Sequence, residues 1–296
     1  MPHGPTLPLE ILELFIDEVG FSTSDSRKAL GACLSVSRSF RLRARHHLFH
    51  SIDPVSTYEN QKFEVTRRIS FLRQLTVDAP NDAESIAPLV RHLTVSFACQ
   101  VLDCWDFVQI LERFMMDDCR VECMILRGPN LNYPSWKAYS NKFQETIRRL
   151  SRWPSLKVLI VCNILEIPTS FFRGIRVQKL HIQQLFGSHH LFTGGQRSEE
   201  SATDDEHDDC EMAIQSLFTD HSCKVYLFDE HHQFFGAPSL EQASFRINRQ
   251  DGMDGSICKI LPRIRKTLED LTLQIFRKYQ PRNQCLQNLI IHSSQS

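Results

Sequence analysis

The sequence predicts an α+β protein with two parts: three short helices over residues 1–54 and an irregular α/β repeat domain over residues 55–296. Two observations support this prediction. Apolar side chains recur at helical spacing in the first fifty or so residues, between short polar turns. Further along, the pattern apolar-x-x-apolar-x-apolar recurs between helix-like stretches, which is typical of short buried strands.

Composition limits the classes of function. The chain has 296 residues, 42% of them hydrophobic, which is enough for one large domain or for a small domain with a larger one. A net charge of −1 argues against a general nucleic-acid binder, whose surface is usually strongly basic. No apolar run approaches the roughly 18 residues of a membrane span, and "MPHGPTLPLE" does not resemble a signal peptide. Ten scattered cysteines then indicate reduced thiols in a cytoplasmic or nuclear protein.

The first predicted helix is "LPLEILELFIDEV", residues 7–19. Pro8 suits a first helical turn, and Gly20 is expected to end the helix. Its apolar positions cover more than the single stripe of an ordinary surface helix. They form two rows, one with Ile11 and Phe15 and the other with Leu12, Ile16 and Val19.

A second helix is expected from about Arg27, and a third from about Ser37 to His50. Three short helices make a domain that is only marginally stable alone. Such a unit cannot bury both apolar rows of its first helix within itself. The surplus is therefore expected to meet either the rest of the chain or another protein.

The segments "LPLEILELFIDEV" and "ALGACLSVSRSFRLRARHHLF" together resemble an F-box, over residues 7 to about 52. The stretch "GFSTSDSRK" is longer than usual, which only enlarges a loop. The resemblance implies docking onto the Skp-type adaptor of a cullin–RING ubiquitin ligase. The residues it implies for contact with the adaptor are Leu7, Pro8, Ile11, Leu12 and Phe15, with Leu30, Leu34, Val36 and Phe40 shared between core and interface. The alternative is that all of them form the core of one larger helical domain.

The recurring strand pattern resembles the L-x-x-L-x-L strand of a leucine-rich repeat, without the asparagine that follows it in regular members. The copies are 72–77, 89–95, 121–126, 156–161, 177–182, 240–245, 268–273 and 286–291, with a weaker one at 223–228. Helices are expected within 103–115 and 140–153. An irregular solenoid is predicted, which an F-box often precedes in that family; an ordinary α/β domain is the alternative. The last copy has no polar cap after it, so it is either a bare edge or the end of a truncated chain.

No motif indicates catalysis or a cofactor: a phosphate-binding glycine loop, G-x-S-x-G and H-E-x-x-H are all missing from the sequence. The acidic run 194–211 is predicted to be a solvated loop. Its metal-site alternative lacks the glycine turn and spacing of a calcium loop; the ligands would be Asp204, Asp205, His207, Asp208, Asp209 and Cys210. The spacings of Cys99/Cys104 and Cys119/Cys123 do not fit a zinc frame.

The expected function is that of a non-catalytic adaptor which binds the Skp-type adaptor, through it a cullin, and an unidentified substrate protein. No nucleic acid, membrane, metal or cofactor is expected as a partner. One alternative is a leucine-rich-repeat scaffold outside any ligase. Another is a helix-turn-helix regulator that places "RSFRLRARHH" in DNA, although the basic charge is local.

Overall fold

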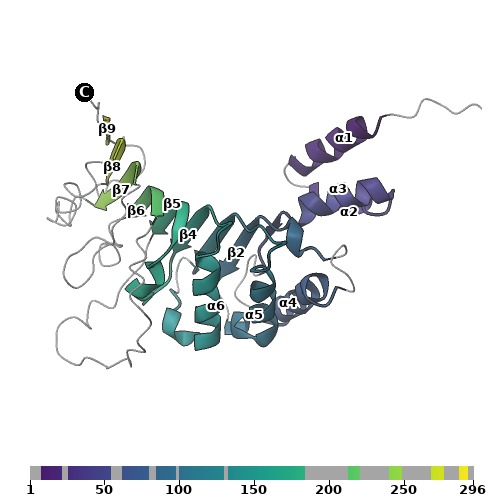
Figure 1. Cartoon of the computed structure of the whole chain (residues 1–296), viewed down its shortest axis with the longest axis horizontal. Coiled ribbons are helices and arrows are strands. Elements are labelled where there is room, and N and C mark those ends of the chain that lie inside the picture. Colours follow the sequence, from purple (N-terminus) through teal and green to yellow (C-terminus); the bar gives the residue numbers. More distant parts are fainter. Residues whose placement is uncertain are drawn as a thin grey trace, which may run out of the picture.

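The computed structural model describes residues 8–21, 26–54, 62–79, 85–97, 100–129, 133–183, 213–220, 240–248, 268–276 and 287–292. Within these ranges the chain forms helices and one open sheet (Figure 1). The α-helices are α1 (Leu9–Phe21), α2 (Ser26–Cys33), α3 (Arg38–Phe49), α4 (Lys62–Thr76), α5 (Trp105–Arg113) and α6 (Asn141–Ser151). The 3₁₀ turns are η1 (Ala87–Leu89), η2 (Gln100–Asp103), η3 (Trp136–Ala138) and η4 (Thr169–Phe172).

The sheet has nine strands in the order of the chain, from β1 to β9. They are β1 (Ser51–Ile52), β2 (His92–Ser96), β3 (Cys123–Arg127), β4 (Val158–Cys162), β5 (Arg176–Gln183), β6 (Ala213–Asp220), β7 (Gln242–Asn248), β8 (Asp270–Phe276) and β9 (Gln287–His292). Strands β1 to β8 are parallel, and β9 is antiparallel to β8. Helices α4, α5 and α6 connect successive strands from β1 to β4, and Figure 1 shows all three beneath one face of the sheet. The predicted combination of helices and short strands is confirmed.

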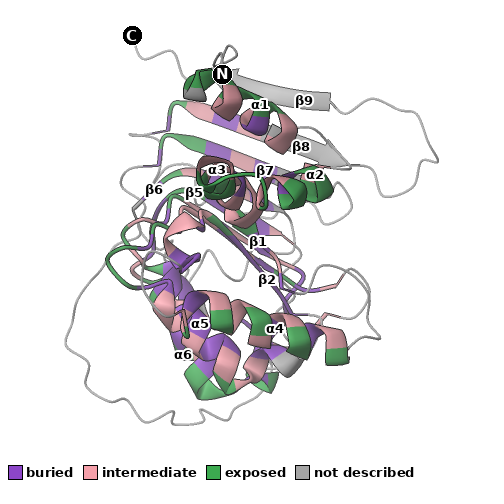
Figure 2. Ribbon diagram, turned by 90° about the vertical axis from the view of Figure 1, so that its right-hand side faces the viewer, coloured by how far each residue is buried: buried purple, intermediate pink, exposed green. Residues whose placement is uncertain are grey.

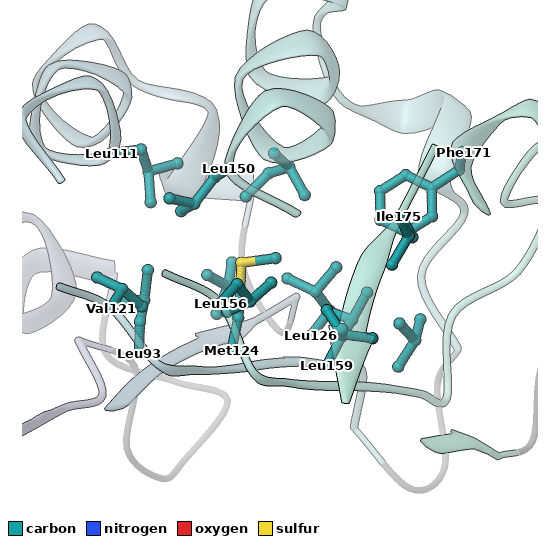
Figure 3. Close-up of a cluster of buried hydrophobic side chains, with 14 of the residues drawn as sticks. Leu93, Leu111, Val121, Met124, Leu126, Leu150, Leu156, Leu159, Phe171 and Ile175 are labelled. Atoms are coloured by element: carbon teal, nitrogen blue, oxygen red, sulfur yellow. The ribbon is translucent and has the colours of Figure 1, made fainter. Parts of the chain in front are cut away.

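The core lies between the sheet and these helices. Side chains alternate between the two faces of a strand, so every second residue points toward the helices. Leu93, Met124 and Leu159 from three neighbouring strands point at Leu111 of α5 and Leu150 of α6 (Figure 3). All five side chains are at most 1% exposed. The repeated leucine pattern therefore supplies one buried residue per strand at the same height, which holds the layers together.

The first three helices pack on each other at the β1 end of the sheet, on the side away from α4, α5 and α6 (Figures 1 and 2). Their own core has three fully buried side chains, Ile16, Leu30 and Ala44, and is separate from the large core. The side chain of Ser37 caps α3 by accepting a hydrogen bond from the backbone N–H of Phe40 at 3.3 Å. This core is small enough that each buried contact in the unit matters for its stability.

One predicted strand is wrong: residues 72–77, "LRQLTV", are the end of helix α4 and the residue after it. Leu72 and Leu75 are three residues apart, a spacing that also places two side chains on one face of a helix. They continue the row started by Val65 and Ile69, which are 8% and 1% exposed. Two leucines three residues apart therefore do not by themselves distinguish a helix from the predicted strand pattern. The longer row of apolar residues at helical spacing indicates the helix.

The other predicted strands form, except the weak copy at 223–228, which lies outside the described residues. Strand β6 (Ala213–Asp220) was not predicted, because Thr219 takes the third position of the pattern, where it is 2% exposed. The last strand reverses direction. Only residues 277–286 connect β8 to β9, and a parallel crossover usually needs a dozen or more residues.

Candidate functional site

Helix α1 presents an apolar row to solvent, made of Ile11, Leu14 and Phe15, which we call the outer face of α1. These side chains are 39%, 62% and 62% exposed. Their spacing of three and four residues places them together on one side of the helix. The opposite row holds Ile16, which is 2% exposed and part of the core of the three helices. The two apolar rows predicted from the sequence therefore separate into an exposed row and a row that is buried at Ile16 and partly buried at Leu12 and Val19.

The orientation of α1 is held by a carboxylate. Both oxygens of Asp17 accept hydrogen bonds from the guanidinium of Arg43 in α3, at 2.6 and 2.5 Å, and His47 Nε2 lies 2.7 Å from Asp17 Oδ1. The Arg43 hydrogen bond lowers the pKa of Asp17 well below its usual range, and His47 adds to this against the effect of burial. The pair joins the first helix to the third and points Ile11 and Phe15 away from the core.

Gly20 belongs to the same contact. The expectation that it ends the helix is wrong, since α1 continues to Phe21. A Cβ at this position would lie 2.6 Å from Nδ1 of His47. The lack of a Cβ at Gly20 therefore leaves room for the ring of His47, which also contacts Asp17, and does not serve to end the helix.

The other residues implied by the F-box resemblance are in mixed environments. Val36 is 63% exposed and Pro8 is also exposed, whereas Leu30, at 3%, is fully in the core. The remaining three, Leu12, Leu34 and Phe40, are partly buried. Leu7 lies outside the described residues. The sequence reasoning omitted Leu14 from the interface, although its position three residues after Ile11 was a sufficient signal.

The basic stretch of α3 is partly used inside the protein. Arg43 binds Asp17, and Nε of Arg41 donates to the backbone carbonyl of Leu34 at 3.0 Å. A recognition helix instead keeps its basic side chains available for bases and phosphates. The geometry of α3 thus offers fewer available cations than its sequence implies.

A second candidate surface is the face of the sheet opposite to α4, α5 and α6. Its middle row runs across seven strands, and the residues in it are paired in register from one strand to the next. The row consists of Thr94, Ile125, Ile160, His181, Phe218, Ser244 and Thr272. Apart from Thr94, which is 8% exposed, all are partly exposed. After Thr94 the row is apolar and aromatic from Ile125 to Phe218, where the rings of His181 and Phe218 lie 5.4 Å apart. Its last two residues, Ser244 and Thr272, are small and polar.

Four histidines lie where the three helices join the sheet. The ring centroids of His46 and His50 are 5.8 Å apart, and those of His50 and His92 are 4.7 Å apart, while His47 binds Asp17. Burial, and then repulsion by neighbouring positive groups, lowers the pKa of both His46 and His50. The backbone carbonyl of His50 also accepts hydrogen bonds from the N–H groups of Arg91 and His92, both at 2.9 Å. The junction is thus continuous with the first strands of the sheet.

No group of three or more His, Cys, Asp or Glu residues in the described part of the chain is arranged to hold a metal ion. Cys119, Cys123 and Cys162 are thiols whose pKa values are raised by burial, that of Cys119 to about 12. The acidic run 194–211, with the metal ligands considered for it, lies outside the described residues. None of the described helices is long and apolar enough to cross a bilayer.

Comparison with known proteins found no matching family model, no matching curated protein and no matching solved structure.

Proposed function

We propose that this chain is the substrate-recognition subunit of an SCF-type cullin–RING ubiquitin ligase. Its three N-terminal helices would bind the Skp-type adaptor, and its sheet domain, read as a divergent leucine-rich-repeat solenoid, would bind a substrate protein. The observation that supports this best is the outer face of α1, where Ile11, Leu14 and Phe15 are exposed together in a small helical unit. Apolar rows of this kind mark protein–protein interfaces.

The outer face of α1 has enough apolar side chains to anchor a partner protein. Complete burial of a Leu, Ile or Phe side chain is worth roughly 1.5–3 kcal/mol. Because these three side chains already hide part of their area, each would contribute about 1–2 kcal/mol on binding. Phe15 is the aromatic member of the row and is 62% exposed, so it is expected to dominate, as aromatic anchors commonly do.

The mechanism is proximity. A subunit that holds the ligase at one end and a substrate at the other raises the effective concentration of substrate lysines near the activated ubiquitin. No catalytic group in this chain is needed for that role. The sheet face opposite to α4, α5 and α6 is suited to the substrate end, since the residues of its middle row are partly apolar and, apart from Thr94, partly exposed.

The test is binding of the full chain to a purified Skp-type adaptor, measured by calorimetry or pull-down. Ile11→Asp with Phe15→Asp should abolish binding, because both carboxylates would have to be desolvated in the interface. A matched control is Phe63→Asp with Phe71→Asp on α4, two side chains that are 94% and 55% exposed. The control should bind as the wild type does.

If the wild type does not bind the adaptor, or if the α1 variant binds as well as the control, the ligase role is refuted. The chain would then be better described as an interaction scaffold that uses its sheet face alone. Salt-sensitive retention of DNA that depends on Arg41 and Arg45 would instead support the DNA-binding alternative.

A further inference from the structure

A groove of about 630 Å³ lies at the edge of the sheet where strands β3 to β6 begin. Its floor contains Leu156 and Val177, each 3% exposed, and Pro154 is part of its wall. Its rim is polar and exposed and carries three cations and two amides. These are Arg120, Lys157, Arg176, Gln178 and Gln215.

The charge of the groove is only partly balanced. Glu122 is the one anion in its lining, and it already accepts a hydrogen bond from Lys157 at 2.7 Å and lies 3.7 Å from Arg91. The Lys157 hydrogen bond, with the Arg91 charge beside it, lowers the pKa of Glu122, so this carboxylate stays ionised and engaged. The guanidinium groups of Arg120 and Arg176 have no ion pair within the described residues. Within the described residues, two bidentate donors therefore line the same groove without an ion-pair partner of their own.

We propose that this groove binds a carboxylate-rich peptide segment of another protein. Arg120 and Arg176 would each grip a carboxylate in fork geometry, and Gln178 and Gln215 would hydrogen-bond the peptide backbone. Charge complementarity identifies the chemistry of the partner, because the groups available in the groove are cations and amide donors above an apolar floor. The groove is at the beginning of the strands, whereas α1 is in a separate helical unit, so this proposal does not depend on adaptor binding.

The test uses the full chain and a fluorescein-labelled peptide of alternating glutamate and serine, with anisotropy as the readout at low and high salt. The wild type should bind this peptide, with affinity that falls as salt rises, and should not bind the same peptide with glutamine in place of glutamate. Arg120→Glu with Arg176→Glu should weaken binding by about tenfold or more. Arg27→Glu with Lys137→Glu is the matched control, since it makes the same change of charge at exposed positions outside the groove and should change affinity by less than about twofold.

Three results would overturn the proposal, provided that thermal unfolding shows all variants folded. The first is equal binding by the groove variant and the control. The second is equal or tighter binding of a single-stranded oligonucleotide of the same charge, which would assign the groove to phosphates. The third is peptide binding seen only after the acidic residues of 204–211 are changed to amides, which would assign the groove to the chain's own acidic segment.

Discussion

Replacing Asp17 with asparagine should loosen α1 from α3 while the sheet stays intact. Asp17 is 20% exposed and its partner His47 is 16% exposed, but the Arg43 side chain is 40% exposed. Solvent screening therefore reduces the Arg43 contribution to about 0.5–1 kcal/mol, the range of surface pairs. The more sheltered His47 contact adds about 1 kcal/mol. The expected loss is about 1.5–2 kcal/mol, a large share of what a core of three buried side chains supplies.

The measurement is hydrogen exchange by mass spectrometry, with peptides from α1 compared with peptides from β3 and β4 in the same sample. Protection of α1 amides in Asp17→Asn should fall by about 10–30-fold, while the sheet peptides do not change. Glu18→Gln is the matched control, because it removes the same charge from the next, exposed position of the same helix. Its effect should be less than about twofold. Equal losses in the two variants, or a loss below about 0.5 kcal/mol for Asp17→Asn, would refute the reasoning.

Two further predictions concern the rest of the chain. Gly128→Ala should destabilise the fold by more than about 3 kcal/mol, because its Cβ would lie 1.9 Å from the backbone oxygen of Asn163. Gly31→Ala is the control: its Cβ would meet nothing within 4 Å, so this variant should be neutral or stabilising. Thermal unfolding of both variants would measure the difference. Stability should also fall with pH below the usual histidine pKa of about 6.5. The folded-state pKa values of His46 and His50 are lowered, so their contribution is complete above that value and is lost as pH falls through the folded-state pKa values. Denaturant titrations between about pH 7.5 and 5 would measure this, and His50→Gln should flatten the dependence; an unchanged slope would contradict it.

Much of the sheet could be predicted because its signal is local. In each strand, the residues that point toward the helices must be suitable for burial. Leu159 and Val161 of β4 show that the pattern supplies such residues within a few positions. The same local rule failed where a non-apolar residue could be buried, as with Thr219 in β6. It also failed at Leu72 and Leu75. Leucines three residues apart occur in the predicted strand pattern and also on one face of a helix, and here only the apolar row in the preceding turns of α4 indicates the helix.

The candidate sites divide in the same way. The outer face of α1 was predictable, since the surplus of apolar residues in a short helix is visible in the sequence. The groove was not, because Arg120, Lys157 and Arg176 come from three separate strand beginnings and meet only through the parallel register of the sheet. The hydrogen bonds between Asp17 and Arg43 were also not predictable. The two residues are 26 positions apart in the chain, and they meet only because α1 packs against α3.

The junction between the two parts bears on the proposed function. A ligase subunit that works by proximity must keep its two binding surfaces at a defined separation, because a loose connection dilutes the effective concentration that tethering provides. Here α3 runs directly into β1, and the carbonyl of His50 accepts two backbone hydrogen bonds from the start of β2. The outer face of α1 is fixed to α3 by Asp17 and Arg43, and α3 is fixed to the sheet by this junction. A partner on α1 would thus be held at a fixed distance and orientation from a partner on the sheet face. Because His46 and His50 lie at the junction and their pKa values are lowered, this fixed arrangement would be sensitive to acid.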